Sequence, residues 1–79
     1  MYWVYILECN DGTLYTGITT DIKRRMAEHQ DGSGAKYTKI RGVKKLLWQE
    51  SQPDRSLASK REYQIKQLSR DNKLKLIQS

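Results

Sequence analysis

A β-hairpin predicted at the start of the chain limits the folds open to it. Residues 2–8, YWVYILE, are rich in aromatic and β-branched side chains, as expected for a strand that is apolar on both faces and central in a sheet. Asn10-Asp11-Gly12 is a turn signal, because aspartate and glycine tolerate positive φ. Residues 13–18, TLYTGI, are typical of a second strand. The two strands predict an antiparallel hairpin.

The remainder of the chain predicts helices and one further strand. Asp21 is the best N-cap for the first helix, and Asp54 can cap the second. In chain order we expect a helix over 22–30, a basic loop over 35–42, a strand over 43–49 and a helix from 54 to 69. The tail, residues 71–77, fits helical spacing and strand alternation equally well. The fold class is α+β, a three-stranded antiparallel sheet flanked by helices in the order β-β-α-β-α-α.

Length and composition favour one small domain over residues 1–79. The chain is 37% hydrophobic and 30% charged, which is typical of globular proteins. No stretch approaches the roughly 18 apolar residues that a membrane span needs. Cys9 is the one cysteine, so an internal disulfide is impossible and a reducing compartment is the default. We expect a cytoplasmic monomer that does not enter a membrane.

Positive charge is concentrated in the second half of the chain. The net charge is +6, and residues 36–79 carry twelve basic against four acidic side chains. Such a half favours a polyanionic partner, although blocks of charge also serve solubility. Charge alone does not decide between a polyanionic partner and a role in solubility.

Some charged side chains fall on the apolar faces of the predicted helices. With a rotation of about 100° per residue, Arg25 and His29 share a face with Ile22 and Met26. The same rotation places Glu62 in the apolar sector of the second helix. A partly buried carboxylate needs a partner, because its desolvation costs several kcal/mol.

Two interpretations of Glu62 follow. The first is an internal ion pair with Arg25 or Arg61. The second is a functional site in which Glu62 holds a divalent metal ion and Arg25 faces a phosphate. Perturbed charges occur in both settings, so the pattern does not decide between them.

The same residues resemble a known signature. Trp3-Val4-Tyr5 and Tyr15-Thr16-Gly17 stand where the GIY-YIG nucleases have Gly-Ile-Tyr and Tyr-Ile-Gly. The arginine, histidine and glutamate that follow in that family correspond to Arg25, His29 and Glu62. The segment Gly34-Ala35-Lys36-Tyr37-Thr38 is similar to the small stand-alone YhbQ-like members. The resemblance covers nearly the whole chain, although the family's C-terminal asparagine has no counterpart beyond Asn72.

The resemblance implies a metal-dependent nuclease that hydrolyses phosphodiester bonds, in DNA repair or recombination. One Mg²⁺ or Mn²⁺ ion would be held by Glu62, and Arg25 would clamp the phosphate. Tyr5 or Tyr15 would take the proton of the attacking water, and His29 would assist proton transfer or hydrogen-bond a tyrosine. The alternatives are a nucleic-acid-binding module with little or no catalysis, or an accessory domain that acts with a protein partner.

The predicted partner is nucleic acid, with DNA preferred. A basic groove would contact it, with Tyr37 or Trp48 offering a stacking face. Plain solvent-facing charge is the competing interpretation. The groove residues, with Tyr37, are Lys36, Lys39, Arg41, Lys44 and Lys45.

Overall fold

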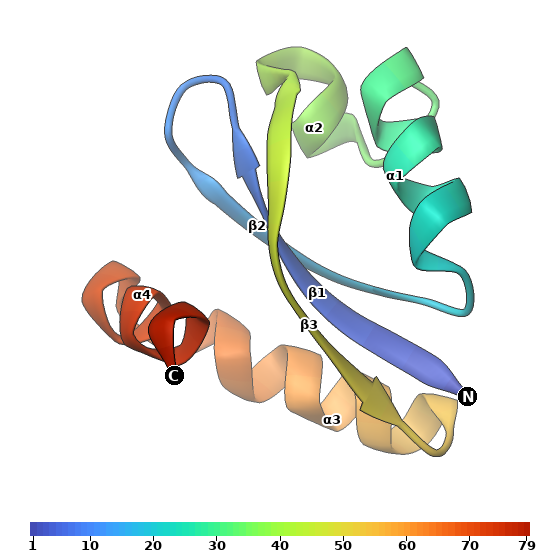
Figure 1. Ribbon diagram of the computed structural model, residues 1–79, viewed down its shortest axis with the longest axis vertical. Coiled ribbons are helices and arrows are strands. Elements are labelled where there is room, and N and C mark those ends of the chain that lie inside the picture. Colours follow the sequence, from blue (N-terminus) through green and yellow to red (C-terminus); the bar gives the residue numbers. More distant parts are fainter.

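The computed structural model describes residues 1–79, a sheet with two helices on each face (Figure 1). The strands are β1 Tyr2–Cys9, β2 Leu14–Thr19 and β3 Val43–Gln52. The helices are α1 Ile22–Asp31, α2 Lys36–Arg41, α3 Arg55–Lys66 and α4 Arg70–Gln78. No helix has the length and apolar character needed to cross a membrane.

The sheet is antiparallel throughout, in the order β2-β1-β3. In the hairpin, Tyr5 lies opposite Gly17 and Leu7 lies opposite Tyr15. β1 is central because its side chains are apolar in both directions, so each can be buried under a layer of helices. The predicted hairpin, central strand and α+β fold class are confirmed, and β2 is left as an edge strand.

The two faces of the sheet carry separate hydrophobic clusters. Val4 and Ile6 pack with Ala58 and Ile65 beneath α3 and α4. Tyr5, Leu7 and Cys9 point to the opposite face, where α1 and α2 cover them. Because successive strand residues alternate between faces, the same strand β1 supplies both clusters. The site described below lies on the face covered by α1 and α2.

Two local predictions were wrong. Residues 35–42 are not a plain loop, because they contain the short helix α2. Its six residues are too few to produce a periodic signal, and its packing over the sheet supplies the stability that so short a helix lacks alone. The predicted helix from 54 to 69 ends at Lys66, because Ser69 starts a new helix by accepting the Asn72 N–H at 3.2 Å.

The structure also decides the tail of the chain and extends the third strand. The tail that fitted both helix and strand is the helix α4. The third strand continues past the predicted end at residue 49 and reaches Gln52, because it pairs with β1 as far as Tyr2.

Candidate active site

A buried hydrogen bond between Tyr5 and His29 forms the centre of the site. Tyr5 comes from β1 and His29 from the last turn of α1, and the Tyr5 hydroxyl lies 2.8 Å from His29 Nε2. Both residues are almost fully buried, at 1% and 2% exposure. The helical rotation predicted that His29 faces inward, and its buried position agrees with that prediction.

The neighbours of His29 allow its protons to be assigned. His29 Nδ1 lies 2.7 Å from Thr38 Oγ1, and the Thr38 hydroxyl donates to the Ala35 carbonyl at 2.9 Å. A hydroxyl has one proton, so Thr38 can only accept from His29. His29 Nδ1 therefore carries the proton and Nε2 is free. We assign the Tyr5 hydroxyl as the donor to Nε2 on this count of donors and acceptors.

Two glycines leave the space that this pair occupies. A methyl group placed at Gly17 would lie 2.6 Å from the Tyr5 hydroxyl, and one at Gly34 would lie 2.5 Å from His29 Nδ1. Both distances are far below a van der Waals contact. Gly17 belongs to the second strand motif, and Gly34 stands just before α2. Glycine is therefore required on both sides of the Tyr5–His29 pair.

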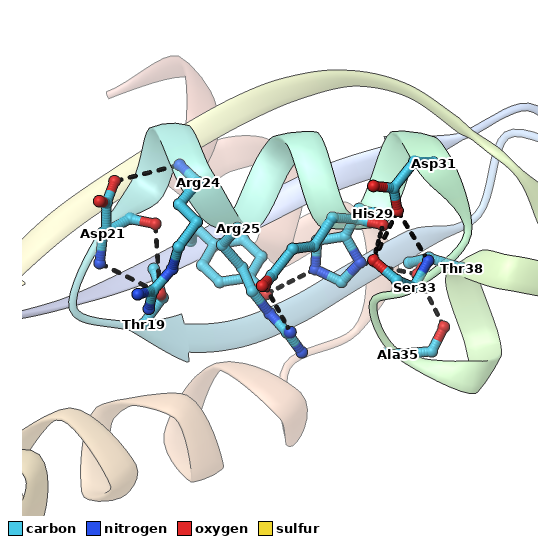
Figure 2. A network of polar contacts seen from close by, with 11 residues as sticks. Thr19, Asp21, Arg24, Arg25, His29, Asp31, Ser33, Ala35 and Thr38 are labelled. Atoms are coloured by element: carbon cyan, nitrogen blue, oxygen red, sulfur yellow. Dashed lines mark hydrogen bonds and ion pairs between the residues drawn. The ribbon is translucent and has the colours of Figure 1, made fainter.

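Arg25 approaches the same tyrosine from α1. Its side chain leaves the helix one turn before His29, as Figure 2 shows, and is 30% exposed. It forms an ion pair with Glu28 at 3.1 Å. Hydrogen bonding with Tyr5 raises the pKa of Arg25, so the guanidinium lies within reach of the Tyr5 oxygen. Arg25 thus faces both the buried pair and solvent.

Burial and charge keep the central pair neutral. Burial raises the pKa of Tyr5, and the Arg25 guanidinium offsets part of that rise. Burial also lowers the pKa of His29, and the positive charge of Arg25 acts in the same direction. A neutral tyrosine donates and a neutral imidazole accepts, which matches the proton assignment above.

Three aromatic rings and His29 pack side by side. Tyr15 on β2 lies 6.4 Å from the Tyr5 ring and 5.5 Å from the imidazole of His29. The Tyr37 ring lies 5.6 Å from that of Tyr15. The Arg41 guanidinium covers Tyr37 at 4.0 Å from the ring centre, so this face of Tyr37 is not free to stack on a base.

Glu62 comes from α3, on the other side of the sheet. Its side chain is 23% exposed and pairs with Lys66 on the same helix at 3.3 Å. The internal pair with Arg25 or Arg61, one of the two interpretations of Glu62, does not form, because Arg25 pairs with Glu28 and Arg61 pairs with Glu50 at 2.9 Å. The negative charge of Glu62 still contributes to the raised pKa of Tyr5.

The donor set fits a hard divalent cation that keeps most of its waters. No group of three or more histidine, cysteine, aspartate or glutamate side chains lies together. One carboxylate completed by waters and substrate phosphate is typical of Mg²⁺ sites. The buried Thr16 hydroxyl has no hydrogen-bond partner. Thr16 lies on the same face of β2 as Leu14 and Ile18, the face that α3 covers.

Of the predicted groove residues, Tyr37 packs beside the aromatic rings of the site, and the basic ones are exposed on α2 and β3. Lys36, Lys39 and Arg41 are exposed on α2, and Arg41 pairs with Asp11 at 3.1 Å. Lys44 and Lys45 are exposed at the start of β3. Trp48 packs against the cluster beneath α3 and lies on the opposite face of the sheet from Tyr37, so the two cannot serve one stacking surface.

Sequence reasoning did not assign a role to Thr38 or Gly34. Both stand in the segment Gly34-Ala35-Lys36-Tyr37-Thr38, which was singled out only for its resemblance. That segment was the available signal. Asn72, the candidate for the family's asparagine, is exposed in the first turn of α4.

The chain is similar in sequence to known proteins. The GIY-YIG catalytic domain family matches residues 1–75. The UPF0213 protein SERP0126 of Staphylococcus epidermidis is 52% identical over 77 residues, which are 98% of this chain and 94% of the relative. The UPF0213 protein VNG_2274C of Halobacterium salinarum is 56% identical over 73 residues, 92% and 95% of the two chains.

A solved structure is similar as well. The solution NMR structure of the UPF0213 protein BH0048 from Bacillus halodurans is 47% identical in sequence. The match covers 99% of this chain and 84% of that chain, with a TM-score of 0.62. The α+β fold described above is therefore shared with an experimental structure.

Proposed function

We propose that this chain, which belongs to the GIY-YIG catalytic domain family, is a nuclease that hydrolyses nucleic-acid phosphodiester bonds with a divalent metal ion. The observation that carries the proposal is the hydrogen-bond chain from Tyr5 through His29 to Thr38, with Arg25 at its open end. DNA is the preferred substrate, with Mg²⁺ or Mn²⁺ as the ion.

The hydrogen-bond chain favours Tyr5 over Tyr15 as the general base. Burial raises the pKa of Tyr5, so a free tyrosinate is scarce at neutral pH. Tyr5 can nevertheless accept a proton from water if it passes its own proton to His29 Nε2 in the same step. The Tyr15 hydroxyl has no such acceptor behind it. Tyr15 then packs against Tyr5 and His29 and holds them in place.

Arg25 would clamp the scissile phosphate. In the free protein its guanidinium lies near the Tyr5 oxygen and pairs with Glu28. A bound phosphate would draw it outward through two parallel hydrogen bonds. That movement would uncover the Tyr5 oxygen for the attacking water. The new P–O bond forms as the water proton passes to Tyr5 and the Tyr5 proton passes to His29 Nε2. The P–O bond to the leaving oxygen breaks, that oxygen takes a proton from solvent, and His29 later returns its extra proton to solvent.

Glu62 would hold the metal ion, in exchange for its pair with Lys66. When bound, the ion would stabilise negative charge on the phosphate oxygens and the leaving oxygen. Because Glu62 is the one carboxylate assigned to the ion, substrate phosphate and water would complete the coordination shell of the ion. Metal affinity should therefore be weak until nucleic acid is present.

A cleavage assay tests this assignment. Single-stranded, duplex and branched DNA are incubated with Mg²⁺ or Mn²⁺ and either wild type, Glu62→Gln or Tyr5→Phe. We expect Tyr5→Phe to lower the rate by about 10²- to 10⁴-fold, the usual contribution of a general base. Glu62→Gln should lower it by at least about two orders of magnitude, since metal stabilisation contributes several kcal/mol.

Glu50→Gln is the matched control. Glu50 is also a partly exposed glutamate in an ion pair, but its partner is Arg61, which lies over Trp48 on the face of the sheet opposite Tyr5. Its rate should stay within about twofold of wild type, as for surface changes away from the site. Equal activity of the wild type and Glu62→Gln would refute Glu62 as the metal ligand, and no cleavage by any form would refute the nuclease assignment.

A nucleic-acid-binding module is the second candidate. The single carboxylate, occupied by Lys66, favours it. Binding without cleavage under every metal condition would establish it in place of the first.

A further inference from the structure

Two basic depressions lie at opposite ends of the edge strand β2. The first, of about 310 Å³, follows the end of β2 at Thr19 and Thr20. Arg24 and Arg25 of α1 and Arg55 of α3 line it, against the single acid Glu28. Figure 2 shows the Arg24 side chain extending from α1 beside Thr19, and the Arg25 side chain leaving the helix further along. Because Glu28 is already paired with Arg25, the depression keeps net positive charge.

The second depression, of about 160 Å³, lies at the start of β2. Thr13 and Leu14 line it together with Tyr37 of α2 and with Arg70 and Lys73 of α4. No acidic side chain lines it. Arg70 donates to the Gly12 carbonyl at 2.8 Å, which holds the arginine against the hairpin turn.

Both depressions bridge the two helical layers. The first joins α1 to α3, and the second joins α2 to α4, so each crosses the open edge of β2. Between them lie Tyr15 and Gly17, which pack on Tyr5. At about 3.3 Å per residue, the six residues of β2 span roughly 20 Å. The candidate active site thus adjoins the first cationic hollow through Arg25, and the second hollow lies at the other end of β2.

We propose that the two depressions are phosphate subsites of one track, along which a single strand of nucleic acid follows the edge of β2. The inference rests on the proposed function, since it places the scissile phosphate at Arg25. A strand of nucleic acid is a regularly spaced polyanion, which suits one cationic subsite at the cleavage point and a second one further along the same strand edge. Arg24, Arg55, Arg70 and Lys73 therefore contact the substrate directly, and none belongs to the groove predicted from sequence.

Binding measured without metal separates this inference from catalysis. The probe is a fluorescein-labelled single-stranded oligothymidylate in EDTA, titrated with salt and followed by anisotropy. Each phosphate contact on a single strand contributes about 0.7 to the slope of log affinity against log salt. Arg24→Gln with Arg55→Gln should make the slope shallower by about 1.4, and Lys73→Gln by about 0.7. The triple variant should show the sum.

The controls change the same charge elsewhere on the same helices. Lys23→Gln with Lys60→Gln matches the first set, and Lys75→Gln matches the second; all three side chains are exposed and line neither depression. Their slopes should equal that of wild type.

Two results would overturn the track. An unchanged slope in Lys73→Gln removes the second depression from the path, and equal losses in variants and controls indicate general attraction without subsites. The proposed function is judged separately. Normal slope changes without cleavage would refute the nuclease while the track stands, and normal cleavage with unchanged slopes would refute the track alone.

Discussion

At the scale of single residues, the directions of the hydrogen bonds determine the chemistry of the site. The Tyr5–His29–Thr38 chain ends at the Ala35 carbonyl, which can only accept, so every proton along it has one direction. Thr38 touches no substrate in this scheme. It is a positioning residue that keeps Nε2 of His29 available to Tyr5.

Thr38→Val should release the imidazole. The buried His29 Nδ1–H would lose its acceptor, at a cost of about 1–3 kcal/mol in the free energy of unfolding. Nitrogen chemical shifts of the one histidine should report Nδ1–H in wild type and a mixture of tautomers in Thr38→Val. Cleavage by Thr38→Val should fall by at least about tenfold. Thr38→Ser keeps the hydroxyl, so it should restore both the Nδ1–H tautomer and the cleavage rate. Identical tautomers in wild type and Thr38→Val would contradict the assignment.

His29 should make stability depend on pH. Burial lowers its pKa in the folded state, so on acidification below about 6.5 the unfolded chain takes up the proton first. The free energy of unfolding should therefore fall as pH drops from about 7 toward the lower folded pKa, by at most about 1.4 kcal/mol per pH unit for one proton. Below the folded pKa the dependence on His29 ends.

Denaturant unfolding between pH 8 and pH 5 measures this dependence. The chain has one histidine, so His29→Gln should remove the slope in this window. The pKa values of Asp11 and Asp31 are lowered by hydrogen bonds from Thr13 and Ser33, and both carboxyls titrate at more acidic pH. A slope that persists in His29→Gln would show that another group is responsible.

At the scale of elements, the start of α1 aligns the site. Thr19 Oγ1 accepts the Asp21 N–H at 3.1 Å, and Asp21 accepts the Arg24 N–H at 3.1 Å (Figure 2). The helix therefore begins directly after β2. Arg25 and His29 follow one turn apart and face the same strand.

Asp21→Ala should loosen this alignment. The loss of an N-cap costs about 1 kcal/mol, and the frayed turn is the one that carries Arg24 and Arg25. We expect lower stability in thermal unfolding and a several-fold rise in KM for DNA. Asp21→Asn is the control, because asparagine caps as well as aspartate does. If both variants lose substrate affinity equally, charge and not the cap explains the effect.

At the scale of the whole molecule, two thin clusters support the site. A chain of this size has a free energy of unfolding of roughly 4–12 kcal/mol. Because β1 is shared between the clusters, loosening the face under α3 should also disturb the site on the other face. Catalytic geometry and global stability are therefore coupled through one strand.

Ile65→Ala tests the packing of the cluster beneath α3. Ile65 is fully buried, and its truncation should cost about 2–5 kcal/mol. The midpoint of thermal unfolding should fall by at least about 8 °C for a domain of this size. Ile40→Ala, at a side chain that is 71% exposed, makes the same chemical change and should leave the midpoint within about 3 °C. Equal shifts would contradict the described packing.

The amino-acid sequence by itself determined what depends on local periodicity and turn chemistry. These are the hairpin, the central β1, the cap at Asp21, and the inward faces of Arg25 and His29. Each follows from residues a few positions apart, and such patterns are set by the geometry of one strand or helix.

Tertiary structure alone decided the partners. Tyr5 meets His29 24 residues away, and Arg70 meets Gly12 58 residues away. Glu62 pairs within α3 with Lys66, four residues on, which helical spacing allows; that Arg61 pairs with Glu50 of β3 instead was decided by the packing of the elements. Which of many possible partners a side chain contacts depends on their distance in space, and local spacing in the sequence does not encode that distance. The two depressions beside β2 exist for the same reason, since each is closed by helices from opposite faces of the sheet.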